Sequence, residues 1–371
     1  MAASLPQLSL QPVTGSAFSI ARYKIKPAFF EKLCCNTIAE VRRVLPPKYW
    51  KGYRLYAGDG TTISVPVSKS TIDHFGVFAQ TESETKTVMA NACMIYDVLS
   101  NYVVDAKIGP TEKSEFSFIQ EMVTNQAFTN DKSILILDRG FSKFYFYKML
   151  IDRTVDFCIR QKISGHDFSE RVFNIADDDF VTEWQPSAAE LATCKQKGIE
   201  AAPIKVRVTK ITLSSGETEL LISSLFDQEH ISVEDLKELY HFRWFVEEAF
   251  KQLKPQMKLE QFGCRKAEGV YQEFYAHIIM LNITTLIGSL AESQIQQKTQ
   301  GRKYRYQFNR VNAWKFIRGK IAALYITKWR IKIIMELVWQ IAGSIVAIVP
   351  NRSFPRNHKF KRKNRFSPMY K

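Results

Sequence analysis

The chain has 371 residues, of which 46% are hydrophobic and 24% are charged. These values are typical of a globular protein with a sizeable core and two or three domains, or one large domain with an insertion, which excludes a chain that is disordered as a whole. The formal net charge is +15 and is unevenly placed: residues 294–371 hold 19 Lys or Arg and one acidic residue, whereas the rest hold 33 basic and 36 acidic residues. A cationic C-terminal part favours a polyanionic partner such as nucleic acid. A solvated basic arm is the alternative on charge alone.

Neither a secreted protein nor a membrane protein is indicated. The six cysteines form no C-x-x-C pair and no zinc-binding spacing, so we expect free thiols in a reducing cytoplasm. The N-terminus lacks the basic and then apolar pattern of a secretory signal. Two apolar stretches, 276–291 and 333–349, are shorter than the ~20 apolar residues of a membrane span, so we expect buried core helices and no membrane partner.

Residues 1–50 are expected to form a helical lead-in. Their apolar positions from residue 27 to residue 44 suit a helix, which Pro46 and Pro47 end. The next three stretches are rich in β-branched and aromatic residues and predict three antiparallel strands, at residues 53–67, 88–98 and 102–108. The first of these strands carries Asp59 and continues past this carboxylate.

The following elements alternate between helix and strand. Residues 112–128 predict a helix, and residues 133–137 (SILIL) predict a strand that is buried on both faces. Asp138 follows this strand directly, and a helix at 142–152 and a strand at 155–160 come next. Three strands, a helix, a strand, a helix and a strand are the chain order of a ribonuclease H-like core. We therefore expect an α/β fold with a mixed five-stranded sheet flanked by helices.

Residues 161–228 interrupt this alternation and predict a mostly β insertion. A long helix follows from Ser232, which forms a capping-box pattern with Asp235 and leads through apolar positions at helical spacing to about residue 254. Later helices are predicted at about 268–292 and 312–348, and the tail from residue 351 is basic. The expected parts are the lead-in (1–50), the first part of the core (51–160), the β insertion (161–228), the second part of the core with the catalytic helix (229–292) and a helical, basic C-terminal region (293–371).

One face of the helix at 232–254 combines a carboxylate with two cations and a phenol. At ~100° per residue, four side chains fall within about 60° of one another, and these are Tyr240, Arg243, Glu247 and Lys254. An ordinary salt bridge between Arg243 and Glu247 is the alternative explanation of the same spacing. Glu248 points ~100° away from this face and is the weaker candidate for a role in a site.

Asp59 and Asp138 each lie at or beside a strand that is expected in the centre of the sheet. A carboxylate against a buried strand is costly to leave unpaired, so a cation should lie beside it. This cation is either a Lys or Arg side chain or a pair of Mg²⁺ ions, because hard cations prefer carboxylate oxygens. The first and fourth strands of a ribonuclease H-like sheet are neighbours, so the two aspartates would be adjacent. A third carboxylate would come from a helix alongside.

The segment from Tyr240 to Lys254 matches the pattern Y-x2-R-x3-E-x6-K. It resembles the YREK signature of DDE transposases from the fourth insertion-sequence family, which includes the transposase of transposon Tn five. Residues 59–61 (DGT) and 138–141 (DRGF) are similar to the segments around the first and second aspartates of that family, and residues 16–26 are similar to its lead-in. The likeness covers roughly residues 16–290.

The resemblance implies a ribonuclease H-like fold and a cut-and-paste reaction that uses Mg²⁺ or Mn²⁺, with two ions per active site. It makes three carboxylates the catalytic metal ligands, namely Asp59, Asp138 and Glu247. It assigns phosphate contacts near the transposon end to Tyr240, Arg243 and Lys254. Arginine suits this role because its planar guanidinium binds phosphate oxygens in pairs.

Three further side chains are weighed as site residues against a structural role. Trp244 either stacks on an extruded base or packs in the core, and Trp184 in the insertion has the same two interpretations. Asp97, at the end of a predicted strand, is interpreted as a turn or surface residue.

The partners that the resemblance implies are double-stranded DNA, as terminal inverted repeats and as target, and a second copy of the chain in a DNA-bound homodimer. Only 58 residues precede Asp59, fewer than in many relatives. We therefore expect the ends of the element to be recognised by a small N-terminal helix, by the basic C-terminal tail, or by residues missing from this open reading frame. The expected location is the nucleoid of a bacterial cytoplasm. Two alternatives remain, a ribonuclease H-like nuclease without strand transfer and a catalytically inactive or domesticated DNA-binding protein.

Overall fold

The computed structural model describes residues 13–80, 86–125, 132–213 and 216–349. The chain divides into two compact units, each built from separate segments. Unit 1 comprises Met1–Pro46, Thr62–Ala90 and Lys251–Lys371, and unit 2 comprises Pro47–Thr61 and Asn91–Phe250. Three elements pass from one unit into the other, namely β1 (Arg54–Val65), β3 (Lys86–Asp97) and α9 (Trp244–Lys251).

Unit 2 is built on a mixed sheet. β5 (Ser133–Leu137) runs parallel to β1 and to β6 (Asp156–Gln161), and it is buried along its whole length. β4 (Tyr102–Pro110) pairs with β3 after a four-residue connection. A connection this short makes the pair antiparallel, because parallel strands need a longer crossover. The five strands stand in the order β4-β3-β1-β5-β6, and each lies where an apolar run predicts a strand.

The sheet is larger than the predicted five strands, because the insertion extends it. β9 (Thr218–Ser223) pairs antiparallel with β6, β8 (Ile204–Thr212) with β9, and β7 (Asp179–Trp184) with β8, which gives a nine-stranded sheet. The edge of β6 is thereby covered by further strands, which satisfies its backbone groups. The insertion also contains two helices, α6 (Asp167–Phe173) and α7 (Ala188–Gln196), so it is less purely β than expected. Part of its predicted turn, residues 214–215, lies outside the described residues.

The side chains of unit 2 decide between the two interpretations of Trp184 and correct the surface interpretation of Asp97. Trp184 is fully buried, and its ring stacks on Phe168 at a centroid distance of 4.0 Å, so it packs in the core and does not meet a DNA base. Asp97 accepts hydrogen bonds from the turn that follows it, but it is also fully buried and forms an ion pair of 2.8 Å with Arg54. Two helices of unit 2 connect strands of this sheet. α4 (Glu115–Thr124) lies between β4 and β5 in the chain, and α5 (Phe144–Asp152) lies between β5 and β6.

The prediction of a single long helix from residue 232 to residue 254 is wrong. The structure has α8 (Val233–His241), then α9 (Trp244–Lys251), then a π-helical turn, η3 (Gln252–Gln256). Between α8 and α9 the backbone bonds span three residues, as in the bond from the Arg243 amide to the Tyr240 carbonyl, and this tightens the chain into a break. Pro255 lacks the amide hydrogen that regular α-helix would need, which accounts for the altered last turn.

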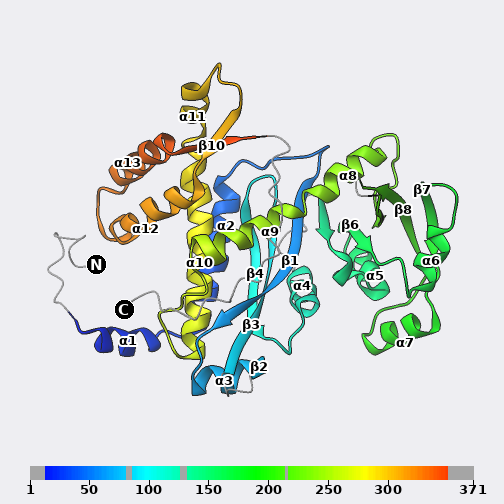
Figure 1. Cartoon of the computed structure of the whole chain (residues 1–371), viewed down its shortest axis with the longest axis horizontal. Helices are drawn as coiled ribbons and strands as arrows, with labels where there is room; N and C mark the ends of the chain where they lie inside the picture. The colour runs from blue at the N-terminus through cyan, green and yellow to red at the C-terminus, as the bar shows by residue number, and fades with distance from the viewer. Residues whose placement is uncertain (1–12, 81–85, 126–131, 214–215, 350–371) are drawn as a thin grey trace. The chain divides into compact units, whose positions relative to one another are not determined.

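Unit 1 is mainly helical. α2 (Pro27–Val44) packs along α10 (Ala267–Ser289), the long yellow helix of Figure 1. An apolar cluster that includes Phe308, Leu337 and Ile341 joins the later elements to α10. The remaining elements are α1 (Gly15–Tyr23), α3 (Lys69–Phe75), α11 (Glu292–Thr299), α12 (Arg310–Ile326), α13 (Arg330–Gly343), the two-residue strand β2 (Ala79–Gln80) on β3, and the antiparallel pair β10 (Arg305–Phe308) and β11 (Ile345–Ile348).

The two apolar stretches singled out in the sequence lie in this unit. The first forms the C-terminal half of α10, which is largely buried, and the second forms part of α13 followed by β11. In the described ranges no single helix is long and apolar enough to cross a membrane, and only α10 and α11 together, bent by 50°, meet the length and composition of a broken span. The predicted helix at 312–348 is thus two helices and a strand. The basic tail from residue 351 lies outside the described residues.

Candidate active site

Asp59 stands in the middle of β1, on the strand that pairs with β5. Its side chain is 21% exposed, and its Oδ1 accepts a hydrogen bond of 2.9 Å from the Gly60 amide. Burial raises the pKa of this carboxyl from 3.8 to about 6, although Gly60 and Arg243 act in the opposite direction. The negative charges of Glu247 and Glu115 raise it further. Asp59 is therefore a carboxylate that a cation would stabilise.

Asp138 follows the last residue of β5 and precedes the short 3-10 turn η2 (Arg139–Phe141). The parallel register pairs Ala57 with Ile136, so two residues further along Asp59 and Asp138 come to the same level of the two neighbouring strands. The Oδ1 atom of Asp138 accepts a hydrogen bond of 3.2 Å from the hydroxyl of Tyr240 at the end of α8. The second aspartate is thus joined to the segment that carries the third carboxylate.

Arg243 links two of the three carboxylates, Asp59 and Glu247. Its Nη2 lies 2.8 Å from Glu247 Oε1, one helical turn along α9, and its Nη1 lies 3.9 Å from Asp59 Oδ2. Burial lowers the pKa of Arg243, but Tyr240, Glu247 and Asp138 more than offset this, and the net shift is upward. The guanidinium also lies over the rings of Tyr240 and Trp244, at 5.8 and 5.3 Å from their centroids. Asp59, Asp138, Glu247, Tyr240 and Arg243 therefore form one connected group in unit 2.

The two aromatic side chains beside Arg243 differ in exposure. Tyr240 is 7% exposed, and burial raises the pKa of its hydroxyl well above the usual value, so it remains a hydrogen-bond donor. Trp244 is 38% exposed, so the core-packing interpretation does not hold for it and its ring is accessible to a ligand.

Lys254 belongs to the other unit. It lies in η3, where its Nζ donates a hydrogen bond of 2.7 Å to the Thr62 carbonyl and is 3.7 Å from Glu260 Oε1. The single-helix geometry that put it on one face with Glu247 does not apply, because α9 ends at Lys251 and a π-helical turn follows.

Two carboxylates near the site were missed by sequence reasoning. Glu219 on β9 forms an ion pair of 2.8 Å with Arg160; burial raises its pKa, and the charge of Asp138 adds to this effect. Glu115, the first residue of α4, packs against Gly60 so closely that a Cβ at Gly60 would lie 2.3 Å from its Cδ. The glycine after Asp59 was the one visible signal of this close approach, since neither glutamate shares a spacing with the motif.

The donor chemistry of the group suits a divalent cation, because Asp59, Asp138 and Glu247 offer the carboxylate oxygens that Mg²⁺ and Mn²⁺ bind. However, no three Asp, Glu, His or Cys side chains in the described part of the chain lie close enough to hold one ion. The positive charge beside Asp59 and Glu247 is that of Arg243. The Nε of Arg243 is buried and has no hydrogen-bond partner, so this arginine is not fully satisfied where it stands.

Comparison with known proteins finds a family model that matches the chain, and solved structures that include a transposase. A family model described as a transposase DDE domain matches residues 50–283, which include Asp59, Asp138 and Glu247. No curated protein matches the chain. The piggyBac transposase, in a cryo-EM structure of its synaptic complex with hairpin DNA, is 9% identical with a TM-score of 0.45. The match covers 87% of this chain and 63% of that one, so this chain spans less than two thirds of that transposase.

Proposed function

The chain belongs to the transposase DDE domain family, and from this premise we propose that it catalyses cut-and-paste transposition of an insertion sequence. In this reaction the chain hydrolyses phosphodiester bonds at terminal inverted repeats and transfers the freed 3′ ends to target DNA. The observation that carries the proposal is the connected group of Asp59, Asp138 and Glu247, joined through Arg243 and Tyr240.

The strand order supports the narrower assignment to a ribonuclease H-like fold. β4-β3-β1-β5-β6 combines three antiparallel strands with two parallel ones, and Asp59 and Asp138 lie on the neighbouring strands β1 and β5. The pattern Y-x2-R-x3-E-x6-K supports assignment to the YREK group. Two of its four members, Arg243 and Glu247, form an ion pair, as an ordinary salt bridge at this spacing also would, and the hydroxyl of Tyr240 donates a hydrogen bond to Asp138.

We assign metal binding to Asp59, Asp138 and Glu247, as two Mg²⁺ or Mn²⁺ ions per active site. Such ions supply activation of the attacking hydroxyl and stabilisation of the leaving oxygen. Asp59 must lose its proton to take part, and because its pKa in the metal-free chain is about 6, protons compete with the metal at lower pH. Arg243 and Tyr240 would hold a substrate phosphate, since a guanidinium and a phenol both donate hydrogen bonds to phosphate oxygens. Trp244, exposed beside them, would stack on an unpaired base.

The proposed partners are double-stranded DNA and a second copy of the chain, bound at the two ends of the element in a bacterial nucleoid. The charge distribution supports the first partner. In residues 294–349, 11 Lys or Arg accompany one acidic residue, Glu336. Surfaces of this kind bind the DNA backbone, with an affinity that falls steeply with salt.

The proposal is tested by cleavage of labelled DNA that carries the inverted repeats of the element, with Mg²⁺ or Mn²⁺, by the wild type and by Glu247→Gln. We expect nicking at the element boundary that needs the metal and is lost in the variant by at least ~10³-fold. Glu248→Gln, a change at the exposed neighbouring carboxylate, is the matched control and should cut like the wild type.

Other outcomes identify the alternatives. Binding without cleavage by the wild type would indicate a DNA-binding remnant of a transposase. Cleavage of both ends without joining of a pre-cut end to target DNA would indicate a nuclease that lacks strand transfer. Equal cleavage by the wild type and Glu247→Gln would remove Glu247 from the site.

A further inference from the structure

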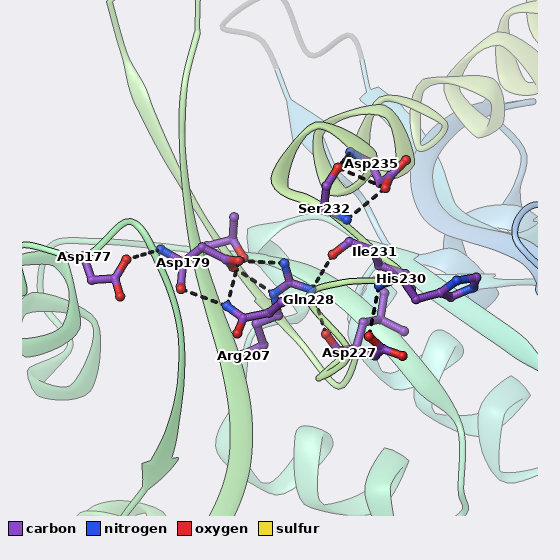
Figure 2. A network of polar contacts seen from close by, with 11 residues as sticks. Asp177, Asp179, Arg207, Asp227, Gln228, His230, Ile231, Ser232 and Asp235 are labelled. Atoms are coloured by element: carbon purple, nitrogen blue, oxygen red, sulfur yellow. Dashed lines mark hydrogen bonds and ion pairs between the residues drawn. The ribbon is translucent and has the colours of Figure 1, made fainter.

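A second polar network in unit 2 centres on Arg207, an arginine of β8 with no exposed surface (Figure 2). Its Nε and Nη2 donate to the two carboxylate oxygens of Asp179 on β7, at 2.8 and 2.7 Å. Asp179 Oδ1 also accepts a hydrogen bond of 2.7 Å from Thr209, its partner across the β7–β8 pair. A buried charge is expensive unless it is paired and hydrogen-bonded, and this pair meets both conditions.

The remaining donors of Arg207 hold a loop. Its Nη1 donates to the carbonyl of Leu225 at 3.0 Å and to the carbonyl of Ile231 at 2.8 Å, near the two ends of the connection between β9 and α8. The side-chain Nε2 of Gln228, midway along this connection, donates to Asp179 Oδ2 and to the Asp179 carbonyl, both at 2.9 Å. The loop is therefore clamped at three points by one arginine–aspartate pair (Figure 2).

The clamp ends where α8 begins. Ser232, the residue after Ile231, is the N-cap of α8 and forms a capping box with Asp235. Lys51 also contacts both the loop and α8. Its Nζ lies 2.8 Å from Asp235 Oδ2 and donates a hydrogen bond of 3.0 Å to the His230 carbonyl. The direction and start of α8 are thus set by groups that lie outside α8.

The far end of α8 reaches the candidate active site. Tyr240 is the second-last residue of this nine-residue helix and donates to Asp138, and the break that follows presents Arg243 to Glu247 and Asp59. A helix is stiff over nine residues, so a change in its start moves its end. We propose that Arg207 and Asp179 are positioning residues for the proposed active site, which hold the β9–α8 loop and thereby place Tyr240 and Arg243 against the carboxylates.

This inference rests on the proposed function for its catalytic consequence, but the clamp itself is testable in the DNA-free chain. The variants are Arg207→Lys and Gln228→Ala. Lysine keeps the charge but cannot bond to two carbonyls and two carboxylate oxygens in one plane. Gln228 is exposed, so its loss removes one clamp point without opening the core. The matched control is Asp178→Asn, at the residue beside Asp179 whose side chain is 77% exposed and lies 3.5 Å from Lys210.

The first measurement is amide hydrogen exchange in residues 225–243 of the full chain without DNA. We expect exchange of α8 to rise at least about fivefold in Arg207→Lys, by less in Gln228→Ala, and not at all in the control. The second measurement is the single-turnover cleavage rate at saturating DNA, well below the melting temperature of every variant. It should fall about tenfold or more in Arg207→Lys, with less than about a twofold change in DNA affinity, because a small displacement of a catalytic group costs rate more than binding.

The outcomes separate this inference from the proposed function. If Arg207→Lys melts earlier but leaves α8 exchange and the cleavage rate unchanged, the pair only stabilises the fold and the inference is wrong. A wild type that cuts no DNA would overturn the proposed function, and the exchange of α8 would still decide whether the clamp holds this helix. Faster α8 exchange with an unaltered rate at saturating DNA would overturn the catalytic consequence.

Discussion

Asp59 and Arg243 show how one side chain sets the properties of another in this chain. β1 carries Asp59 into a partly buried position that disfavours its ionised form, and Arg243 stands 3.9 Å away as the nearest described positive charge. Arg243 therefore offsets only part of the cost of burying the Asp59 charge. This arrangement determines how the stability of the chain depends on pH and how strongly the carboxylates bind a divalent cation.

Replacement of Asp59 by Asn is expected to stabilise the chain at neutral pH. The folded chain holds the Asp59 proton more tightly than the unfolded chain does, with a pKa of about 6 against 3.8, so stability is lost as pH rises from about 4 through about 6. Asparagine cannot ionise, so the free energy of unfolding should rise by about 1–3 kcal/mol at pH 7 and be unchanged below about pH 4. Urea unfolding at both pH values measures this difference.

The control for this prediction is Asp73→Asn, a change at an exposed aspartate of α3, which should have little effect at either pH. A gain in Asp59→Asn that is the same at both pH values would contradict the electrostatic explanation and point to packing.

Replacement of Arg243 by Gln is expected to strengthen divalent cation binding in the absence of DNA. The guanidinium lies 2.8 Å from Glu247 and 3.9 Å from Asp59, so it repels a cation that would use these carboxylates. Removal of one charge at such distances should tighten Mn²⁺ binding by roughly tenfold or more, although DNA cleavage falls because a phosphate contact is lost. Titration of DNA-free protein followed by electron paramagnetic resonance of Mn²⁺ measures the affinity.

Arg171→Gln, on the exposed face of α6, is the matched control because it removes the same charge away from the site. An unchanged or weaker Mn²⁺ affinity in Arg243→Gln would show that the arginine does not oppose metal binding.

At the scale of elements, the sequence predicted the strands and the contacts between nearby residues that depend on a local pattern. The apolar run SILIL became the buried strand β5, and the i, i+4 spacing of Arg243 and Glu247 became an ion pair. The break between α8 and α9 was not predictable, because apolar positions continue through it at helical spacing. The pairing of β9 with β6, which brings Glu219 near Asp138, also was not predictable, since it joins strands about 60 residues apart.

The contact between α10 and β10 gives a stability prediction for unit 1. A Cβ at Gly288 of α10 would lie 2.3 Å from Cζ of Phe308, whose ring is buried and has little room to move. Gly288→Ala should therefore lower the free energy of unfolding by about 1–3 kcal/mol through overpacking. Chemical denaturation of the full chain measures the change.

Gly319→Ala is the matched control, because this glycine also lies in a helix, α12, but a Cβ there meets nothing within 4 Å. It should raise stability by about 0.5–1 kcal/mol, as expected for alanine in an open helical position. Equal effects of the two substitutions would mean that the Phe308 ring yields freely.

At the scale of the whole molecule, chain order and spatial grouping differ. The predicted parts of the chain are contiguous ranges, whereas each unit is assembled from separate segments, with β1, β3 and α9 shared between them. Single-sequence patterns report on neighbours along the chain, so they cannot show which distant segments share a core. Composition, by contrast, is read directly from the sequence, and it is the strongest whole-molecule signal here. The concentration of positive charge after residue 293 is the basis of the proposed contact with DNA.

Removal of residues 351–371 tests how much of DNA binding comes from this charge. The segment holds eight Lys or Arg and no acidic residue. Each phosphate contact releases counterions and contributes about −0.9 to the slope of log affinity against log salt. The full chain should therefore show a slope steeper by several units than the truncated one, up to about seven if every cation meets a phosphate. Fluorescence anisotropy with labelled DNA at several salt concentrations measures both slopes.

The control replaces residues 351–371 with a neutral segment of equal length, which keeps any steric effect and removes the charge. If the tail recognises the inverted repeats, its loss should weaken binding to them more than binding to unrelated DNA; if it only contacts the backbone, both should weaken equally, because phosphates carry no direct sequence information. An unchanged slope would place the DNA contacts outside the tail, on the N-terminal helix, on the 11 cations of residues 294–349 or on unit 2. Arg243→Gln would then measure the share of the candidate active site, since this substitution removes only a contact there.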